Sequence, residues 1–231
     1  MELLYKLKHS VDSKEIGIYD QIQTHGAYDR FGPDSYIHVP IDGPIDFDIK
    51  FPVFIMEKRA RKTDWLTCVP LSGKFLVISP KTLEVFKTQN IDNFQSYPVK
   101  ISHKDEEYDY YAFYLTTGKQ REFINWKESE FSLVNNDGFY NESGKSLWKE
   151  LKLFKFNNYD EYLSMIRSFR ETNQRIRPKT IKFTGFYNSD LFRLRNPVNG
   201  YYCSEKLKNA VIENGLTGFD FKPIEEELAD L

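Results

Sequence analysis

Few residues of the sequence have the types and spacing that local catalytic or metal-binding motifs require. The four histidines, His9, His25, His38 and His103, are far apart, and none belongs to a His-Glu-x-x-His pair that would place two zinc ligands on one helix face. Ser72-Gly73-Lys74 matches the end of a phosphate-binding loop, but the leading glycine is absent, so its backbone amides are not arranged to cradle phosphate. We therefore expect no metal ligands, no cofactor, no catalytic residues and no enzymatic activity.

The two cysteines, Cys68 and Cys203, are widely separated and form no Cys-x-x-Cys motif. Cys203 could pair with His103 as nucleophile and base, but a lone cysteine among aromatic residues more often packs as a small hydrophobe. Two buried free thiols are typical of a reducing compartment rather than of a disulfide framework. We therefore expect a cytoplasmic protein.

Charged residues are numerous but balanced, with 32 Lys and Arg against 34 Asp and Glu. The net charge of −2 argues against nucleic-acid binding, which needs a positive field over part of the surface. The basic run Lys58–Lys62 is either a local basic patch or, as is commoner for such runs, a solvated loop. Acidic and apolar residues alternate over Ile41–Asp48 without the spacing of a Ca²⁺ loop, which predicts a strand with one solvated, negative face.

The elements that must position any site are mostly strands. Aromatic residues make up 16% of the 231 residues, and such residues favour pleated, half-buried surfaces. No apolar run reaches signal-peptide length or the roughly 20 residues that span a bilayer, so we expect no membrane association. Residues 1–50 are rich in glycine, proline and aspartate and are predicted to be mainly irregular. Apolar and alternating runs predict strands over residues 51–56, 65–70, 75–78, 108–115, 123–126, 181–186, 201–203 and 217–221, and residues 91–99 are expected to lead into the strand at 108–115.

Three helices are predicted from their capping residues. Ser79 precedes Pro80 at the first helical position, Asn158 precedes a helix over residues 159–171, and Ser204 caps a helix that Asn214-Gly215 ends. Asn135–Gly138 carries an Asp-Gly hairpin signal. The predicted fold class is α+β, sheet-rich, with about three helices packed on a mixed or antiparallel sheet. Residues 1–231 form a single domain in this interpretation, and any division into two lobes falls near residues 70–80.

Several segments together resemble one known family. They are Phe75–Ser79 with the helix that follows, Asn93–Val99, Tyr108–Tyr111, Ile124–Phe131, Asp190–Leu194, Ser204–Lys208 and Gly215–Phe221. In order and spacing, they are similar to the bacterial polymorphic-toxin immunity family that was first catalogued as a domain of unknown function. The likeness covers about residues 70–224 and is most specific near the C-terminus. The sequence departs from the pattern at Asn125, where an aspartate is expected before the tryptophan, and in the looser spacing of Arg170–Pro178.

The resemblance implies a cytoplasmic immunity protein that binds and neutralises a cognate toxin domain by stoichiometric protein–protein inhibition. It implies no cofactor and no catalytic residues. The matching positions are expected to determine the fold: Phe192, Leu194, Leu207 and Phe219 as core residues, and Gly218 as a backbone position that tolerates no side chain. The sequence specifies neither the toxin nor the oligomeric state.

Exposed acidic and tyrosine residues are the best candidates for a toxin-binding surface. Asp105, Glu106, Glu107 and Tyr108 form one such group, and the alternative is that they are simply the polar tip of a hairpin. A second functional hypothesis is a ligand-binding regulator or small enzyme with a pocket built from aromatic residues. A deep pocket with convergent polar groups would favour that hypothesis.

Overall fold

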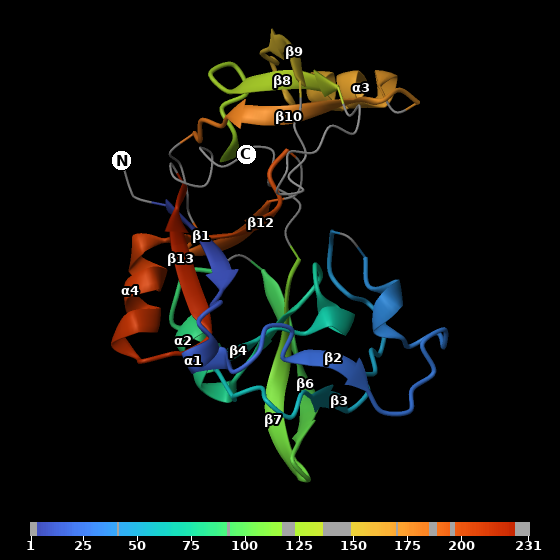
Figure 1. Cartoon of the computed structure of the whole chain (residues 1–231), viewed down its shortest axis with the longest axis vertical. Helices are drawn as coiled ribbons and strands as arrows, with labels where there is room; N and C mark the ends of the chain where they lie inside the picture. Colours follow the sequence, from blue (N-terminus) through green and yellow to red (C-terminus); the bar gives the residue numbers. More distant parts are fainter. Residues whose placement is uncertain are drawn as a thin grey trace.

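The computed structural model describes residues 4–40, 42–91, 93–116, 123–135, 149–169, 171–184, 189–194 and 197–224 (Figure 1). Among the described residues, strands account for 40% and helices for 20%, and the sheets are mixed and antiparallel. The predicted class, a sheet-rich α+β fold, is therefore confirmed.

The largest sheet has six strands in the order β2-β3-β6-β7-β5-β4. Its strands are β2 (Ile22–His25), β3 (Phe54–Met56), β4 (Trp65–Leu66), β5 (Leu76–Ile78), β6 (Phe94–His103) and β7 (Glu106–Leu115). β3 runs parallel to β6, and the other neighbours are antiparallel. Strands from both sides of residues 70–80 belong to this one sheet, because β3 is hydrogen-bonded to β6.

A second sheet has four antiparallel strands in the order β11-β12-β1-β13. They are β1 (Leu4–His9), β11 (Leu191–Leu194), β12 (Gly200–Ser204) and β13 (Phe219–Pro223). The expectation that residues 1–50 are mainly irregular is therefore wrong for β1, which lies inside this sheet. β1 forms because β12 and β13, both distant in the sequence, supply hydrogen-bonding partners for both of its edges.

The two faces of the four-stranded sheet belong to two different cores. One face contributes Tyr5, Leu7 and Cys203 to a cluster with the helices α2 (Pro80–Lys87) and α4 (Glu205–Glu213). Because successive strand residues point to opposite faces, Leu4 and Tyr202 join a different cluster. The sheet thus sits between the two cores.

A third sheet, with the order β10-β8-β9, packs with helix α3 (Tyr159–Ser168). Its strands are β8 (Glu130–Asn135), β9 (Lys149–Phe154) and β10 (Gln174–Thr180). In Figure 1 this unit lies at the top, with β12 and β1 between it and the six-stranded sheet. The prediction of a strand over residues 181–186 is wrong within the described residues. The observed strand, β10, comes earlier in the sequence and includes Pro178. A proline is tolerated there because β10 is an edge strand and its register shifts between Pro178 and Thr180.

The predicted helix starts are confirmed. The side chains of Ser79, Asn158 and Ser204 each accept a hydrogen bond from the backbone amide three residues on, at 3.1, 2.9 and 3.2 Å. These bonds satisfy amides that have no partner within the first helical turn. A four-residue helix, α1 (Ser13–Ile16), and short 3-10 helices at Tyr36–His38 and Val69–Leu71 complete the described helical elements.

The strand predicted at Ile41–Asp48 is wrong over residues 42–48, which contain bends and no strand. At Ile45, the backbone hydrogen bonds are made to the side chain of Gln95 and not to a neighbouring strand. The amide of Ile45 donates to the Gln95 side-chain oxygen at 2.7 Å, and the Gln95 amide group donates to the Ile45 carbonyl at 3.0 Å. Alternation alone does not produce a strand when a side chain satisfies the backbone.

The strand predicted at 123–126 is also wrong. Ile124 forms an isolated bridge with Phe183, and the chain then turns, with the Ser129 amide and hydroxyl donating to the Asn125 carbonyl at 2.9 and 2.7 Å. This closed turn, which includes Trp126, prevents a ladder from extending. The predicted hairpin at Asn135–Gly138 falls mostly outside the described residues.

The core predictions hold for three of four residues. Phe192, Leu194 and Leu207 are at most 1% exposed. Phe219 is only half-buried and packs its ring 5.3 Å from that of Trp65, so its assignment to the core interior is wrong. Gly218 is confirmed as a position without room, because its φ is +86° and an added Cβ would lie 2.3 Å from the Trp65 carbonyl oxygen.

Candidate functional site

The four residues predicted as a binding group lie at the end of the β6–β7 hairpin. The two ten-residue strands pair from Phe94–Leu115 to His103–Glu106, and Lys104 and Asp105 connect them. Both connecting residues have a positive φ, 53° and 67°, as the tight turns favoured in hairpins require. Figure 1 shows this hairpin ending at the bottom of the molecule, beyond the other strands of its sheet.

The acidic side chains of the tip are accessible. Asp105, Glu106 and Glu107 are exposed, and Tyr108 is half-buried. Glu106 and Tyr108 lie on the same face of β7, and the Tyr108 hydroxyl donates a hydrogen bond to the Glu106 carboxylate. Glu107 points to the opposite face, so carboxylates are available on both sides of the ribbon.

Two lysines from outside the turn contact the tip. The Lys62 ammonium lies 3.7 Å from the centroid of the Tyr108 ring, a cation–π contact. The Lys100 ammonium lies 2.7 Å from the Asp109 carboxylate, and both side chains are more than half exposed. An exposed pair of this kind contributes about 0–1 kcal/mol to stability. Lys62 is exposed, so its contact with the Tyr108 ring contributes about 0.5–1 kcal/mol and restrains the ring only weakly.

The rest of the basic run is a solvated loop. Lys58, Arg59 and Arg61 are exposed, and the Arg61 guanidinium donates to the Lys14 carbonyl. Lys62 contacts the hairpin through the Tyr108 ring, and no sequence spacing pointed to that contact. The four residues of the predicted group do form the polar tip of a hairpin, which was the sequence alternative, and their role in binding stays a prediction.

Chemically, the tip can accept hydrogen bonds from a basic partner surface. Asp105, Glu106 and Glu107 offer oxygen acceptors in a solvated, weakly acidic patch, and the ring of Tyr108 adds apolar area. Carboxylates of this kind steer a positively charged partner during its approach and fix its orientation.

The pairing of Cys203 with His103 receives no support from the structure. Cys203 lies in the four-stranded sheet, and His103 lies at the end of β6 in the six-stranded sheet. Both cysteines are buried and free of disulfides, and burial raises the pKa of the Cys68 and Cys203 thiols to about 12. Because the thiolate is the nucleophile, neither thiol is reactive at neutral pH.

A cavity of about 400 Å³ between the six-stranded and four-stranded sheets has the aromatic lining that the second hypothesis predicts. His9 and Trp65 lie in its wall with ring centroids 3.6 Å apart. Burial lowers the pKa of His9 to about 3, so the imidazole is neutral at pH 7. In the described part of the chain, neither His9 Nδ1 nor Trp65 Nε1 has a hydrogen-bond partner. Both atoms are covered by their surroundings, and the lining of the cavity also includes the polar residues Lys8, Asp20, Thr67 and Ser72.

Within the described ranges, no three His, Cys, Asp or Glu side chains are grouped closely enough to hold a metal ion. In the same residues, no helix is long and apolar enough to cross a membrane. No protein-family model matches the chain, and no curated protein matches its sequence.

Proposed function

We propose that the protein is an immunity protein, which binds a cognate bacterial toxin domain and neutralises it stoichiometrically. In this proposal it acts in the cytoplasm of the toxin-producing cell, without a cofactor and without catalysing a reaction. The proposal is supported by the family resemblance of the segments between residues 75 and 221. The single observation that carries it is the solvated acidic tip of the β6–β7 hairpin, with Tyr108 beside it.

The construction of the hairpin supports a role in binding. Ten consecutive residue pairs connect β6 to β7, and β7 also pairs with β5, so the tip is anchored in the largest sheet. A preformed tip loses little conformational entropy when a partner binds. Tyrosine is enriched among interface residues that contribute most of the binding energy, and Tyr108 is half-buried with its hydroxyl at the surface edge.

The proposed inhibition works by occlusion. The carboxylates of Asp105, Glu106 and Glu107 meet a basic surface of the toxin, for which a substrate-binding face is the natural candidate. The Tyr108 ring packs against an apolar part of the same surface. A stable complex buries about 1,200–2,000 Å² in total, so the tip forms the centre of a larger contact.

Charge reversal tests the proposal. The variant Asp105→Lys, Glu106→Lys, Glu107→Lys reverses the charge of three exposed side chains, and the one hydrogen bond described above that it removes, from the Tyr108 hydroxyl to Glu106, is exposed as well. The matched control, Glu128→Lys, Glu171→Lys, Glu213→Lys, reverses three exposed carboxylates elsewhere. We expect the tip variant to weaken toxin binding by at least about tenfold, mainly through slower association, and the control to leave it unchanged.

The binding experiment uses the toxin encoded beside this protein, co-purified with it and then measured by surface plasmon resonance at two salt concentrations. The association rate of the wild type should fall with salt, and that of the tip variant should fall less. Equal affinity of the wild type and the tip variant would exclude the hairpin as the contact. Absence of any complex with the folded wild-type protein would exclude the immunity function.

A further inference from the structure

A second cavity, of about 500 Å³, opens beside β2 at the edge of the six-stranded sheet. Ile22, at the start of β2, still has a backbone partner on that side, because its amide donates to the Thr67 carbonyl at 3.0 Å and the residue bridges to Cys68. The chain then turns into the 3-10 helix Val69–Leu71, so no strand of the described chain continues beside the rest of β2. The cavity lies in the gap that this turn leaves.

Three segments contribute polar side chains to the cavity. Gln23, Thr24 and His25 come from β2, Arg30 from the loop that follows and Tyr36 from the 3-10 helix Tyr36–His38, while Val69 and Pro70 form the apolar part of the lining. All seven residues and their neighbours in the sequence are among the described residues. Arg30 is the one Lys, Arg, Asp or Glu residue in this described lining, so the cavity carries a positive charge and no carboxylate.

Tyr36 presents a hydroxyl from a buried ring that is held in place. The residue is 5% exposed, and its ring stacks on those of Tyr28 and Phe51 with centroids 5.4 and 6.1 Å apart. Its backbone is fixed as well, because the Tyr36 amide donates to the Tyr28 hydroxyl at 3.1 Å. Within the described chain the Tyr36 hydroxyl has no hydrogen-bond partner, and it is not one of the covered polar atoms. A buried tyrosine hydroxyl normally has a partner, so this one is open to a ligand in the cavity.

The Arg30 guanidinium lies near this hydroxyl. Burial raises the pKa of Tyr36, and the positive charge of Arg30 is the largest influence in the opposite direction. Arg30 is exposed, and among the described residues its guanidinium has no hydrogen bond or ion pair. A free guanidinium beside a free hydroxyl is a pair of donors suited to an oxyanion.

His25 adds a ring nitrogen to the same cavity. Its Nδ1 lies 2.7 Å from the Gly26 carbonyl oxygen, which can only accept, so Nδ1 carries a proton. Its ring also lies edge-on to that of Tyr28, with centroids 5.9 Å apart. In the part of the chain that the structure describes, Nε2 has no hydrogen-bond partner and is not covered. The cavity thus combines two donors with a nitrogen that can share a proton.

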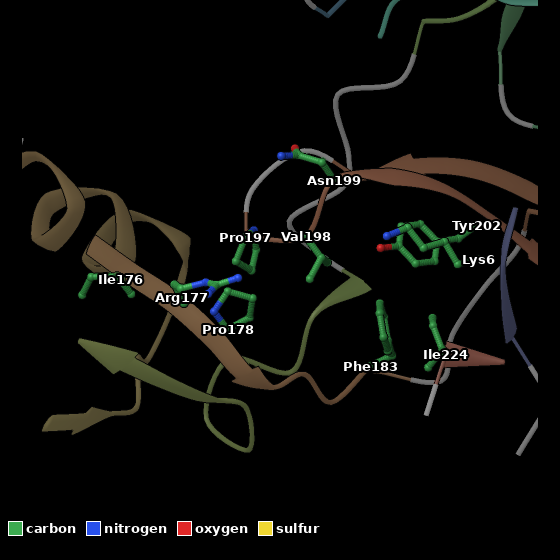
Figure 2. Close-up of a pocket in the computed structure, with 10 residues that line it drawn as sticks. All are labelled: Lys6, Ile176, Arg177, Pro178, Phe183, Pro197, Val198, Asn199, Tyr202 and Ile224. Carbon is green, nitrogen blue, oxygen red and sulfur yellow. The ribbon is translucent and has the colours of Figure 1, made fainter. Parts of the chain in front are cut away.

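The cavity shown in Figure 2, which lies beside β10, differs in this respect. Its polar lining residues, Lys6, Arg177, Asn199 and Tyr202, all have interaction partners of their own. The cavity beside β2 instead offers polar atoms that no described residue engages.

A phosphate group fits these polar atoms better than a carboxylate does. A phosphate monoester has three strong acceptor oxygens and a second pKa of about 6, so near neutral pH it can share a proton with a ring nitrogen. A carboxylate has two oxygens and an ordinary pKa of about 4, so it brings no proton at neutral pH. Arginine is also the cation that matches phosphate geometry through two parallel hydrogen bonds.

We propose that this cavity binds the phosphate group of a small phosphate monoester, with the Arg30 guanidinium and the Tyr36 hydroxyl as donors and His25 Nε2 sharing a proton with a phosphate oxygen. The body of the ester packs against Val69 and Pro70. The volume is larger than a phosphate group needs and lies within the range of about 300–1,000 Å³ that is typical of small-molecule sites. The site shares no residue with the acidic tip and does not depend on the proposed toxin binding.

Isothermal titration calorimetry of the full chain tests the proposal with three probes. Phenyl phosphate carries the phosphate on a ring, inorganic phosphate lacks the ring, and phenyl sulfate has the ring but a group that cannot bring a proton. We expect phenyl phosphate to bind at one site per chain and the other two probes to bind at least about threefold more weakly. Tighter binding of inorganic phosphate would overturn the assignment to an ester and make free phosphate the ligand.

Substitutions locate the binding. Arg30→Met should weaken phenyl phosphate at least about tenfold, and Tyr36→Phe at least about threefold, because they remove a charged and a neutral donor. Tyr36→Phe should melt at the same temperature as the wild type, since the hydroxyl has no partner in the described chain. The controls Arg59→Met and Tyr19→Phe remove an exposed guanidinium and an exposed hydroxyl outside this lining, and should change the affinity less than about twofold.

Three results would overturn the proposal. The first is no binding of phenyl phosphate or inorganic phosphate to the full chain at ~10 mM, a concentration that detects even millimolar affinity. The second is equal weakening by Arg30→Met and Arg59→Met, which would show attraction to the general surface charge. The third is equal affinity for phenyl sulfate and phenyl phosphate, which would show that the cavity does not recognise the phosphate group.

Discussion

Asp190 connects the four-stranded sheet to the start of α4, and its removal is the most informative stability test of the fold. One carboxylate oxygen accepts a hydrogen bond from the Ser204 hydroxyl at 2.7 Å. The other accepts from the backbone amide of Asn90 at 2.9 Å and from the Lys206 ammonium at 2.7 Å. Ser204 in turn accepts from the Leu207 amide and caps the helix. The substitution Asp190→Ala therefore removes the acceptor of three hydrogen bonds in one step.

The magnitude follows from how exposed each partner is. The Lys206 side chain is 59% exposed, so its ion pair contributes about 0–1 kcal/mol. The bonds from Ser204 and Asn90 are made to an ionised carboxylate whose side chain is 11% exposed, and each contributes about 1.5–3 kcal/mol. Because the cost of burying the carboxylate offsets part of this sum, we expect a net loss of about 2–4 kcal/mol in the free energy of unfolding.

The dependence on pH provides an internal check. Burial raises the pKa of Asp190, but hydrogen bonds from Lys206, Ser204 and the Asn90 amide outweigh this effect and lower it below its usual value. The folded state thus favours the carboxylate more than the unfolded state does. The stabilisation is present above the unfolded pKa, about 4, and disappears as the pH falls through the lower folded value.

Urea denaturation of the wild type and Asp190→Ala at pH 7, followed by far-UV circular dichroism, measures the loss. The difference between the two proteins should shrink as the pH falls below about 4. Lys206→Met is the control and should lose no more than about 1 kcal/mol. The reasoning is refuted if Asp190→Ala loses less than about 1 kcal/mol, or if Lys206→Met is as damaging.

Two further predictions concern stability. Gly218→Ala should lower the free energy of unfolding by at least about 2 kcal/mol, because it adds the strain of a positive φ to a backbone clash. Gly215 has a φ of +59° but open space around it, so Gly215→Ala should lose about 1 kcal/mol. Urea denaturation measures both losses. Equal losses would contradict this difference. Burial holds the folded pKa of His9 near 3 against 6.5 when unfolded, so protonation favours the unfolded state, and stability should fall as the pH drops from about 6.5 towards 3. The loss of stability that His9 causes should reach about 2 kcal/mol at pH 5. Thermal melts of His9→Phe over the same pH range should not show this loss. Identical pH profiles of the wild type and His9→Phe would contradict the prediction.

Local chemistry made part of the fold predictable. Ser79, Asn158 and Ser204 cap helices through bonds to amides three residues away, so a short stretch of sequence contains both partners. Likewise, Gly218 precedes a strand at a position that only glycine fits. Such features depend on the backbone nearby, and sequence patterns report them directly.

Long-range pairing made other parts unpredictable. β1 alternates apolar and basic residues over Tyr5–Lys8, but it pairs as a strand because β12 and β13 flank it, and no local pattern specifies those partners. The strand predicted over residues 181–186 instead lies at Gln174–Thr180, where an edge position in β10 accommodates Pro178. At Ile45, the side chain of Gln95, 50 residues away, replaces the predicted ladder.

The same distinction applies to the two sites. Asp105, Glu106, Glu107 and Tyr108 are consecutive, so their grouping at a hairpin end was predictable from the sequence. The contact between Lys62 and Tyr108 was not, because it joins a loop to a strand 46 residues later. The cavity that combines His25, Arg30 and Tyr36 gave no sequence signal, since it forms where Val69 and Pro70, distant in the sequence, lie beside β2.

Growth of cells that express the toxin encoded beside this protein tests the central proposal most directly. The account predicts that the wild-type protein and the control carrying Glu128→Lys, Glu171→Lys and Glu213→Lys restore growth and co-purify with the toxin. The variant carrying Asp105→Lys, Glu106→Lys and Glu107→Lys should be folded and present but should fail to protect. Failure of the folded wild-type protein to restore growth would contradict the immunity function, and full protection by the tip variant would contradict the role of the hairpin.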